Sequence, residues 1–308
     1  MPAVEFTFRG LVVPVFTPFN DDDGQTINLS IIPRYADYLA KKGITAILVG
    51  SSTGEGTSTT MEERKAITEE WVKAVKLTKQ HLMVQVGGAP LPHVLELAKH
   101  AESLKVNSIM CQPDLYFKPS NAEELISYLK MVSDVAPNTP LLYYHNPPFT
   151  HVHINMGQFL ELVGDRIPTF VGIKYYGNNI EEAFEASRAD NGRFVVFLGN
   201  DELILSSCVM GLESFILTGA NIFPELVLSV IDSWKKRDFE AARKKQVLYT
   251  KGYAIMEKYG LWLQTMKYAM RFVASLNVGC PRLPVKYLSS EKETMMNNEL
   301  LSQILKNI

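Results

Sequence analysis

The stretch that decides the fold is T-F-V-G-I-K-Y-Y at residues 169–176, a short apolar run that ends on a single lysine, Lys174. Pro168 precedes the run and Gly177-Asn178-Asn179 follows it, and both flanking sequences favour turns. An apolar run of this length between two turns is typical of a strand buried on both faces. The pattern therefore predicts a parallel strand covered by other elements, with a lysine near its carboxyl end.

Lys174 is an unusual residue for the end of a buried strand. Burying an ammonium group costs on the order of several kcal/mol unless the group is paired or neutral. A neutral amine has a free lone pair that can attack a carbonyl carbon and form a Schiff base. The alternative is a lysine that extends along the surface and keeps its charge in water. This stretch alone leaves both interpretations open.

Strand-like and helix-like segments alternate along most of the chain. Eight apolar runs predict strands at residues 8–17, 44–50, 81–88, 108–113, 140–146, 169–176, 193–199 and 213–218. Helical patterns separate them, and one of these begins with a capping box, Thr60-Met61-Glu62-Glu63. Eight strand–helix units favour a (β/α)8 TIM barrel of the α/β class. A doubly wound sheet fits less well, because no G-x-G-x-x-G follows the first strand.

The pattern becomes purely helical from Phe239 onward. Helices are predicted at residues 239–258, 261–276 and 298–307. No Gly/Ser-rich linker divides the chain. We therefore expect residues 1–238 to form the barrel that carries the active site, and residues 239–308 to form a C-terminal helical extension packed on it.

Composition excludes several classes of function. The 308 residues carry a formal net charge of −2 without a basic stripe, so nucleic acid is not an expected partner. No apolar run is long enough to span a bilayer, and the N-terminus lacks a secretory signal. The three cysteines are far apart, which suits a reducing, cytoplasmic location. His151 and His153 have no apparent third ligand, so no metal is expected.

Polar residues gather where the predicted strands end, which is where barrel enzymes carry their active sites. These residues are Ser52, Thr53, Tyr144, Lys174, Gly199, Asp201, Glu202 and Thr218. The loop S-S-T-G-E-G at 51–56 offers hydroxyl and backbone N–H groups suited to a carboxylate or phosphate, or is simply a turn. Tyr144 is either a proton-transfer phenol or a packed aromatic residue. Asp201 and Glu202 either accept hydrogen bonds from a hydroxylated substrate or begin a helix.

Four motifs, taken together, resemble one family of enzymes. They are G-S-S-T-G-E-G at 50–56, Y-Y-H-N-P-P at 143–148, G-I-K at 172–174 and G-N-D-E at 199–202. Their order and spacing are similar to those of the pyruvate-dependent class I aldolases of the N-acetylneuraminate lyase and dihydrodipicolinate synthase group. The similarity extends from about residue 8 to R-L-P-V at 282–285.

This resemblance implies a homotetramer of barrels that uses no metal or organic cofactor and acts on a 2-keto sugar acid and pyruvate. Lys174 matches the Schiff-base lysine and Tyr144 the proton-relaying tyrosine of the family. Ser52 and Thr53 match the hydroxyl pair that binds the keto-acid carboxylate. Gly199, Asp201 and Glu202 match the residues that hold the hydroxylated tail in sialic acid lyases, and Thr218 matches a hydroxyl of the same region.

Within the family, the residues favour cleavage of N-acetylneuraminate to N-acetylmannosamine and pyruvate. No arginine follows Tyr144 closely, unlike in the dihydrodipicolinate synthases. Tyr176 and Leu217 depart from the sialic acid lyase pattern, and a leucine at 217 is expected to fill space near the sugar. These two residues leave open a smaller substrate, such as 2-keto-3-deoxygluconate or 4-hydroxy-2-oxoglutarate. A third hypothesis for the function is a catalytically silent barrel that binds a keto acid.

Overall fold

Eight parallel strands close into a barrel with the strands in sequence order, as predicted. The computed structural model describes residues 4–22 and 25–307, so residues 1–3 and 23–24 of the expected barrel unit and residue 308 of the expected extension lie outside the description. The strands are β1 Leu11–Pro14, β2 Ala46–Val49, β3 His81–Gln85, β4 Ser108–Cys111, β5 Leu141–His145, β6 Phe170–Tyr175, β7 Val195–Leu198 and β8 Phe215–Ile216. This is the (β/α)8 TIM barrel expected from the sequence.

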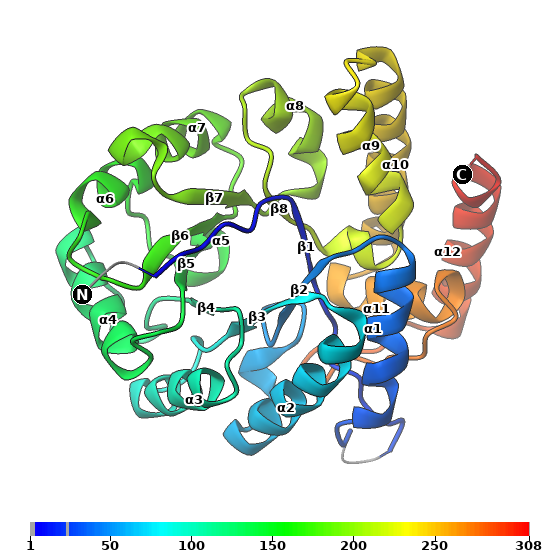
Figure 1. Ribbon diagram of the computed structural model, residues 1–308. Helices are drawn as coiled ribbons and strands as arrows, with labels where there is room; N and C mark the ends of the chain where they lie inside the picture. Colours follow the sequence, from blue (N-terminus) through cyan, green and yellow to red (C-terminus); the bar gives the residue numbers. More distant parts are fainter. Residues whose placement is uncertain (1–3, 23–24, 308) are drawn as a thin grey trace.

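Helices surround the barrel, as Figure 1 shows in a view along its axis. They are α1 Ile32–Lys41, α2 Met61–Thr78, α3 Leu91–Ser103, α4 Ala122–Val135, α5 Pro147–Thr150, α6 Met156–Val163, α7 Ile180–Arg188, α8 Ile204–Val209 and α9 Pro224–Lys235. The predicted capping box is confirmed, because the Thr60 side chain accepts from the backbone N–H of Glu63 and the Glu63 carboxylate accepts from that of Thr60. The sequence pattern missed the short α5.

The buried apolar side chains form two layers. The smaller layer fills the barrel lumen with residues such as Leu48, Met110 and Phe197. The larger layer lies between the strands and the helices around them. Since successive side chains of a strand point to opposite faces, each strand contributes to both layers. The lumen is therefore a packed core below the site, and only its carboxyl end is available for polar groups.

Three further helices follow the barrel: α10 Phe239–Tyr259, α11 Trp262–Val273 and α12 Ser290–Gln303. In Figure 1 they run from yellow to red and gather along one side of the barrel, near α1 and α9. The terminal helix begins earlier than the predicted residue 298, so that prediction was wrong in its start. Ser289 caps α12 by accepting from the backbone N–H of Lys292. None of the helices in the described part of the chain is long and apolar enough to cross a membrane.

Candidate active site

Lys174 and Tyr144 lie side by side inside the barrel. The two residues are register partners on the neighbouring strands β6 and β5. The Lys174 Nζ lies 4.1 Å from the centroid of the Tyr144 ring. Lys174 is 4% exposed, so the interpretation of a solvent-exposed lysine was wrong. A buried amine in contact with a phenol is an arrangement that can form a Schiff base and transfer a proton.

Gly199 leaves space for the side chain of Lys174. A Cβ added to Gly199 would lie 2.9 Å from the Cε of Lys174 and 3.3 Å from the Cδ2 of Tyr176. Such distances are shorter than an ordinary van der Waals contact, so any side chain at 199 would displace the lysine. The sequence suggested Gly199 as a contact for the sugar. In the structure, the absence of a side chain at this position leaves room for Lys174.

Tyr144 has a partner that the sequence reasoning did not single out. The Asn146 side chain donates a hydrogen bond from Nδ2 to the Tyr144 hydroxyl oxygen at 3.1 Å. Asn146 is buried, and its Oδ1 has no hydrogen-bond partner among the described residues. The signal was available, because Asn146 belongs to the Y-Y-H-N-P-P motif. The donated bond fixes the orientation of the phenol next to the amine.

His145, the neighbour of Tyr144, does not join this pair. Its ring stacks on that of Tyr175 at 5.4 Å, and it also contacts Tyr143. Both tyrosines belong to the layer outside the barrel. Burial lowers the pKa of His145 to about 4, with a smaller contribution from His153. The imidazole is therefore neutral near pH 7 and packs as part of the core.

The loop after β2 is joined to the turn after β8. The hydroxyl oxygens of Thr53 and Thr218 are 2.9 Å apart and share a hydrogen bond. Ser52 is half-buried and lines a cavity of about 370 Å³ with Ser51 and Gln112. Ser52 thus borders a cavity whose lining residues include neither Lys174 nor Tyr144. The resemblance paired Ser52 with Thr53, and the structure adds Thr218 to that pair.

Asp201 and Glu202 have very different surroundings, although the sequence suggested a shared role. Asp201 is 6% exposed, and its Oδ1 accepts hydrogen bonds from the Gly219 backbone N–H at 2.9 Å and from the Tyr249 hydroxyl. Burial raises the pKa of Asp201 to about 6, and the Tyr249 hydrogen bond and the Lys174 charge oppose that rise. Glu202 is exposed. Asp201 thus braces the turn after β8, while Glu202 faces solvent.

Tyr249 is a residue of α10 that sequence patterns could not identify as part of the site. Its ring is fully buried, and it reaches Asp201 across 48 positions of the chain. A tyrosine inside an amphipathic helix normally indicates only a core position. Which polar group such a tyrosine meets depends on how the helix docks, and sequence spacing does not specify that.

Leu217 and Tyr176, the two residues that depart from the family pattern, lie on different sides of the barrel wall. Leu217 is fully buried in the layer between the strands and the helices. Its side chain does not enter the lumen, so the expectation that it fills space near the sugar was wrong. Tyr176 packs against the lumen layer and lies close to Gly199. Of these two residues, Tyr176 is therefore the one that borders the space around Lys174.

The described residues contain no group of three or more His, Cys, Asp or Glu side chains arranged to hold a metal ion. Among the described residues, the polar groups near Lys174 are the Tyr144 phenol, the Asn146 amide that donates to it and the Asp201 carboxylate. This donor set is suited to hydrogen bonding with an oxygen-rich organic molecule.

Known proteins resemble this chain along nearly its whole length. It is 32% identical over 285 residues to N-acetylneuraminate lyase of Gallus gallus, which covers 92% of both chains. The identity to N-acetylneuraminate lyase of Homo sapiens is also 32% over 285 residues, with 92% of this chain and 88% of the relative covered.

Solved structures of similar proteins share the fold closely. N-acetylneuraminate lyase of Aliivibrio salmonicida superposes with a TM-score of 0.91 at 29% identity, covering 97% of this chain and 98% of the other. N-acetylneuraminate lyase of Proteus mirabilis gives a TM-score of 0.90 at 27% identity, covering 96% and 98%. The model of the dihydrodipicolinate synthetase family matches residues 7–303. Because this model matches nearly the whole chain, and because the chain has the closed barrel and a buried lysine, the chain belongs to the dihydrodipicolinate synthetase family.

Proposed function

We propose that this protein is a class I aldolase, a carbon–carbon lyase that cleaves N-acetylneuraminate to N-acetylmannosamine and pyruvate. The observation that carries the proposal is the buried Lys174 amine, 4.1 Å from the centre of the Tyr144 ring at the carboxyl end of the barrel. The substrate is supported by relatives at 32% identity that bear the name N-acetylneuraminate lyase.

The chemistry begins at Lys174. The lone pair of its amine attacks the C2 ketone of the open-chain sugar acid, and the Tyr144 hydroxyl gives its proton to the departing water, which leaves a protonated Schiff base. This cation accepts the electron pair of the C3–C4 bond, which breaks as Tyr144 takes the proton of the C4 hydroxyl. N-acetylmannosamine leaves as the aldehyde. Tyr144 returns this proton to C3 of the remaining enamine, and water then hydrolyses the Schiff base to pyruvate and free lysine, with the released proton restoring the Tyr144 hydroxyl.

The other site residues bind the two ends of the substrate. Ser52 and Thr53 hold the carboxylate, and such orientation can supply several kcal/mol of barrier reduction. The hydrogen bond between Thr53 and Thr218 supports this loop from the β8 side. Gly199 and Glu202 line the path of the sugar tail. Asp201 acts through the turn after β8, in keeping with its burial and its bond to Gly219.

The proposed reaction uses no metal and no organic cofactor, because the Schiff base itself is the electron sink. We also propose a cytoplasmic location. It is supported by the state of Cys111, Cys208 and Cys280, which are all free thiols in the structure.

Borohydride trapping tests the assignment. Incubation with pyruvate followed by sodium borohydride should leave a reduced pyruvyl adduct on Lys174, located by mass spectrometry of the digest. Lys174→Ala should give no adduct and no turnover of N-acetylneuraminate. A folded wild-type protein without any adduct would point instead to a catalytically silent barrel.

A panel of aldehydes separates the proposed substrate from smaller ones. With pyruvate in excess, condensation with N-acetylmannosamine should proceed with a higher kcat/KM than condensation with glyceraldehyde or glyoxylate. A preference for either small aldehyde would favour the reading that Tyr176 restricts the site to a shorter keto acid.

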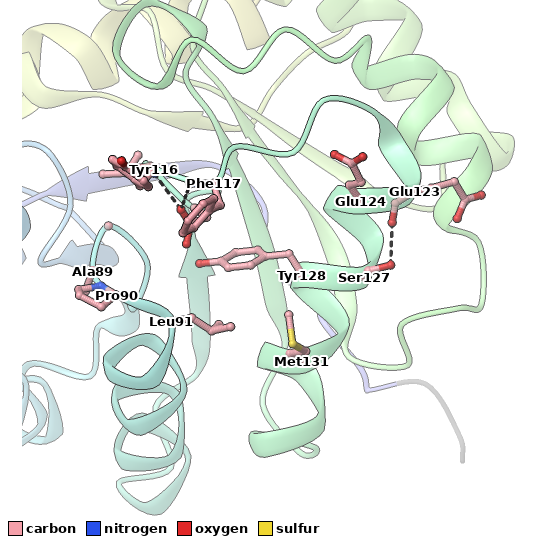
Figure 2. A pocket seen from close by; sticks show the side chains of 13 residues that line it. Ala89, Pro90, Leu91, Tyr116, Phe117, Glu123, Glu124, Ser127, Tyr128 and Met131 are labelled. Carbon is pink, nitrogen blue, oxygen red and sulfur yellow. Dashed lines mark hydrogen bonds between the residues drawn. The ribbon is translucent and has the colours of Figure 1, made fainter.

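We further propose that the protein assembles as a homotetramer, as its resemblance to the family implies. Support comes from Tyr116 and Phe117, two aromatic residues that are 85% and 83% exposed. Figure 2 draws them over a groove of about 900 Å³ between the start of α3 and the side of α4, where Leu91 and Met131 lie. Exposed aromatic residues beside an apolar groove are typical of an interface.

A further inference from the structure

A buried ion pair connects the loop after β2 to the C-terminal helices. The Lys267 Nζ on α11 donates to the Glu55 Oε1 at 2.7 Å. Both side chains are shielded from solvent, with 0% and 3% of their area exposed. Nζ also donates to the backbone carbonyls of Thr17 at 2.9 Å and Cys280 at 3.2 Å. All three protons of the ammonium group are therefore engaged.

The second carboxylate oxygen of Glu55 is engaged as well. Its Oε2 accepts from the backbone N–H of Arg282 at 2.7 Å. Glu55 has a φ of 53°, in the left-handed region that non-glycine residues rarely adopt. Its own backbone N–H donates to the carbonyl of Ser52 at 3.2 Å. A continuous chain of contacts thus runs from Lys267 through Glu55 to Ser52.

Stability alone is a poor explanation for this pair. Removing two charges from water costs on the order of several kcal/mol per ion, and well-packed apolar residues of similar size are often at least as stabilising. What a buried ion pair provides is a single defined geometry, because any other arrangement leaves a charge without a partner. The loop it fixes carries the hydroxyls of Ser52 and Thr53.

We propose that Lys267 is a positioning residue of the active site, which acts through Glu55 to hold Ser52 and Thr53 in place for the keto-acid carboxylate. This inference rests on the proposed aldolase function. It makes α11, which lies outside the barrel proper, part of the substrate-binding apparatus. Both carboxylate oxygens of Glu55 are taken up by Lys267 and Arg282, so this side chain acts by holding the loop.

The test measures the rate of borohydride trapping against pyruvate concentration, which gives a half-saturating concentration and a maximal rate. Lys267→Met should raise the half-saturating concentration about tenfold or more and leave the maximal rate within about threefold. Glu55→Gln, which changes no volume, should act in the same direction and serves as the second variant if Lys267→Met does not fold.

The double variant Glu55→Gln/Lys267→Met separates positioning from stability. Because it leaves no unpaired buried charge, its melting temperature should recover toward that of the wild type. Its half-saturating pyruvate concentration should stay raised, since the ion pair that anchors the loop of Ser52 and Thr53 to α11 is still missing. Recovery of both quantities together would mean that the pair serves the fold alone, and it would overturn the proposal.

Leu300→Ala on α12 is the matched control. Leu300 is a fully buried residue of the C-terminal helices that belongs to the outer apolar layer. Its truncation should lower the melting temperature but leave the half-saturating concentration unchanged. A folded Lys267→Met protein with wild-type half-saturation contradicts the positioning role. Absence of any wild-type adduct contradicts the aldolase function itself, so the two failures are distinct.

Discussion

At the scale of single residues, Lys174 depends on the missing side chain of Gly199. An added methyl group would lie 2.9 Å from the Cε of Lys174, near the flexible end of that side chain, and 3.3 Å from the backbone oxygen of Tyr175. Gly199→Ala should therefore move the amine and lower kcat by tenfold or more, while the melting temperature changes by only a few degrees. Turnover of N-acetylneuraminate and thermal unfolding measure the two effects. A variant with wild-type kcat would show that Lys174 does not need the space at Gly199, and it would contradict the prediction.

Asp201 gives the protein a pH dependence of known sign. Burial raises the pKa of this carboxyl from 3.8 to about 6. The folded state thus holds the proton more tightly than the unfolded state, and the contribution of Asp201 to stability is lost as pH rises through 6. Relative to Asp201→Asn, the wild type should lose about 2 kcal/mol of unfolding free energy between pH 4 and pH 7.

Asparagine is the suitable comparison because its Oδ1 can still accept from Gly219 and Tyr249. Urea unfolding of both proteins at a series of pH values provides the measurement. Parallel stability curves across this range would contradict a raised pKa for Asp201.

At the scale of elements, the start of α2 is set by local sequence. Thr60 and Glu63 form a capping box directly after the loop that carries Ser52 and Thr53. Thr60→Ala should cost about 1 kcal/mol of stability, because one backbone N–H of the first turn loses its acceptor. Thr60→Ser keeps that acceptor and should cost much less. Urea unfolding compares the two, and equal losses would assign the effect to packing of the threonine methyl group.

At the scale of the whole molecule, the exposed aromatic residues above the groove predict the assembly state. Tyr116→Ser/Phe117→Ser should shift the protein from the proposed tetramer to smaller species, because the proposed interface loses two large apolar side chains. Leu77, which is 82% exposed on α2, offers a control, and Leu77→Ser should leave the assembly unchanged. Analytical ultracentrifugation distinguishes the outcomes. A tetrameric double variant would place the interface elsewhere.

Much of the fold could be read from local patterns. Apolar runs between turns predicted all eight strands, and the capping box predicted the start of α2. The start of α12 was missed because the helix has only a weak apolar stripe. The site was predictable where residues follow strand ends, since the barrel brings those ends together whatever the details of packing. Lys174 and Tyr144 are of this kind, as neighbours on β6 and β5.

The sequence by itself determined the barrel and the residues at its carboxyl end, because strand periodicity and turn chemistry act over a few residues. Only the tertiary structure decided which groups those residues meet. Tyr249 reaches Asp201, and Lys267 reaches Glu55, across long stretches of chain. Leu217 faces the outer layer and not the sugar site. These contacts depend on how whole helices dock and on which face each strand position takes, and no short-range pattern carries that information.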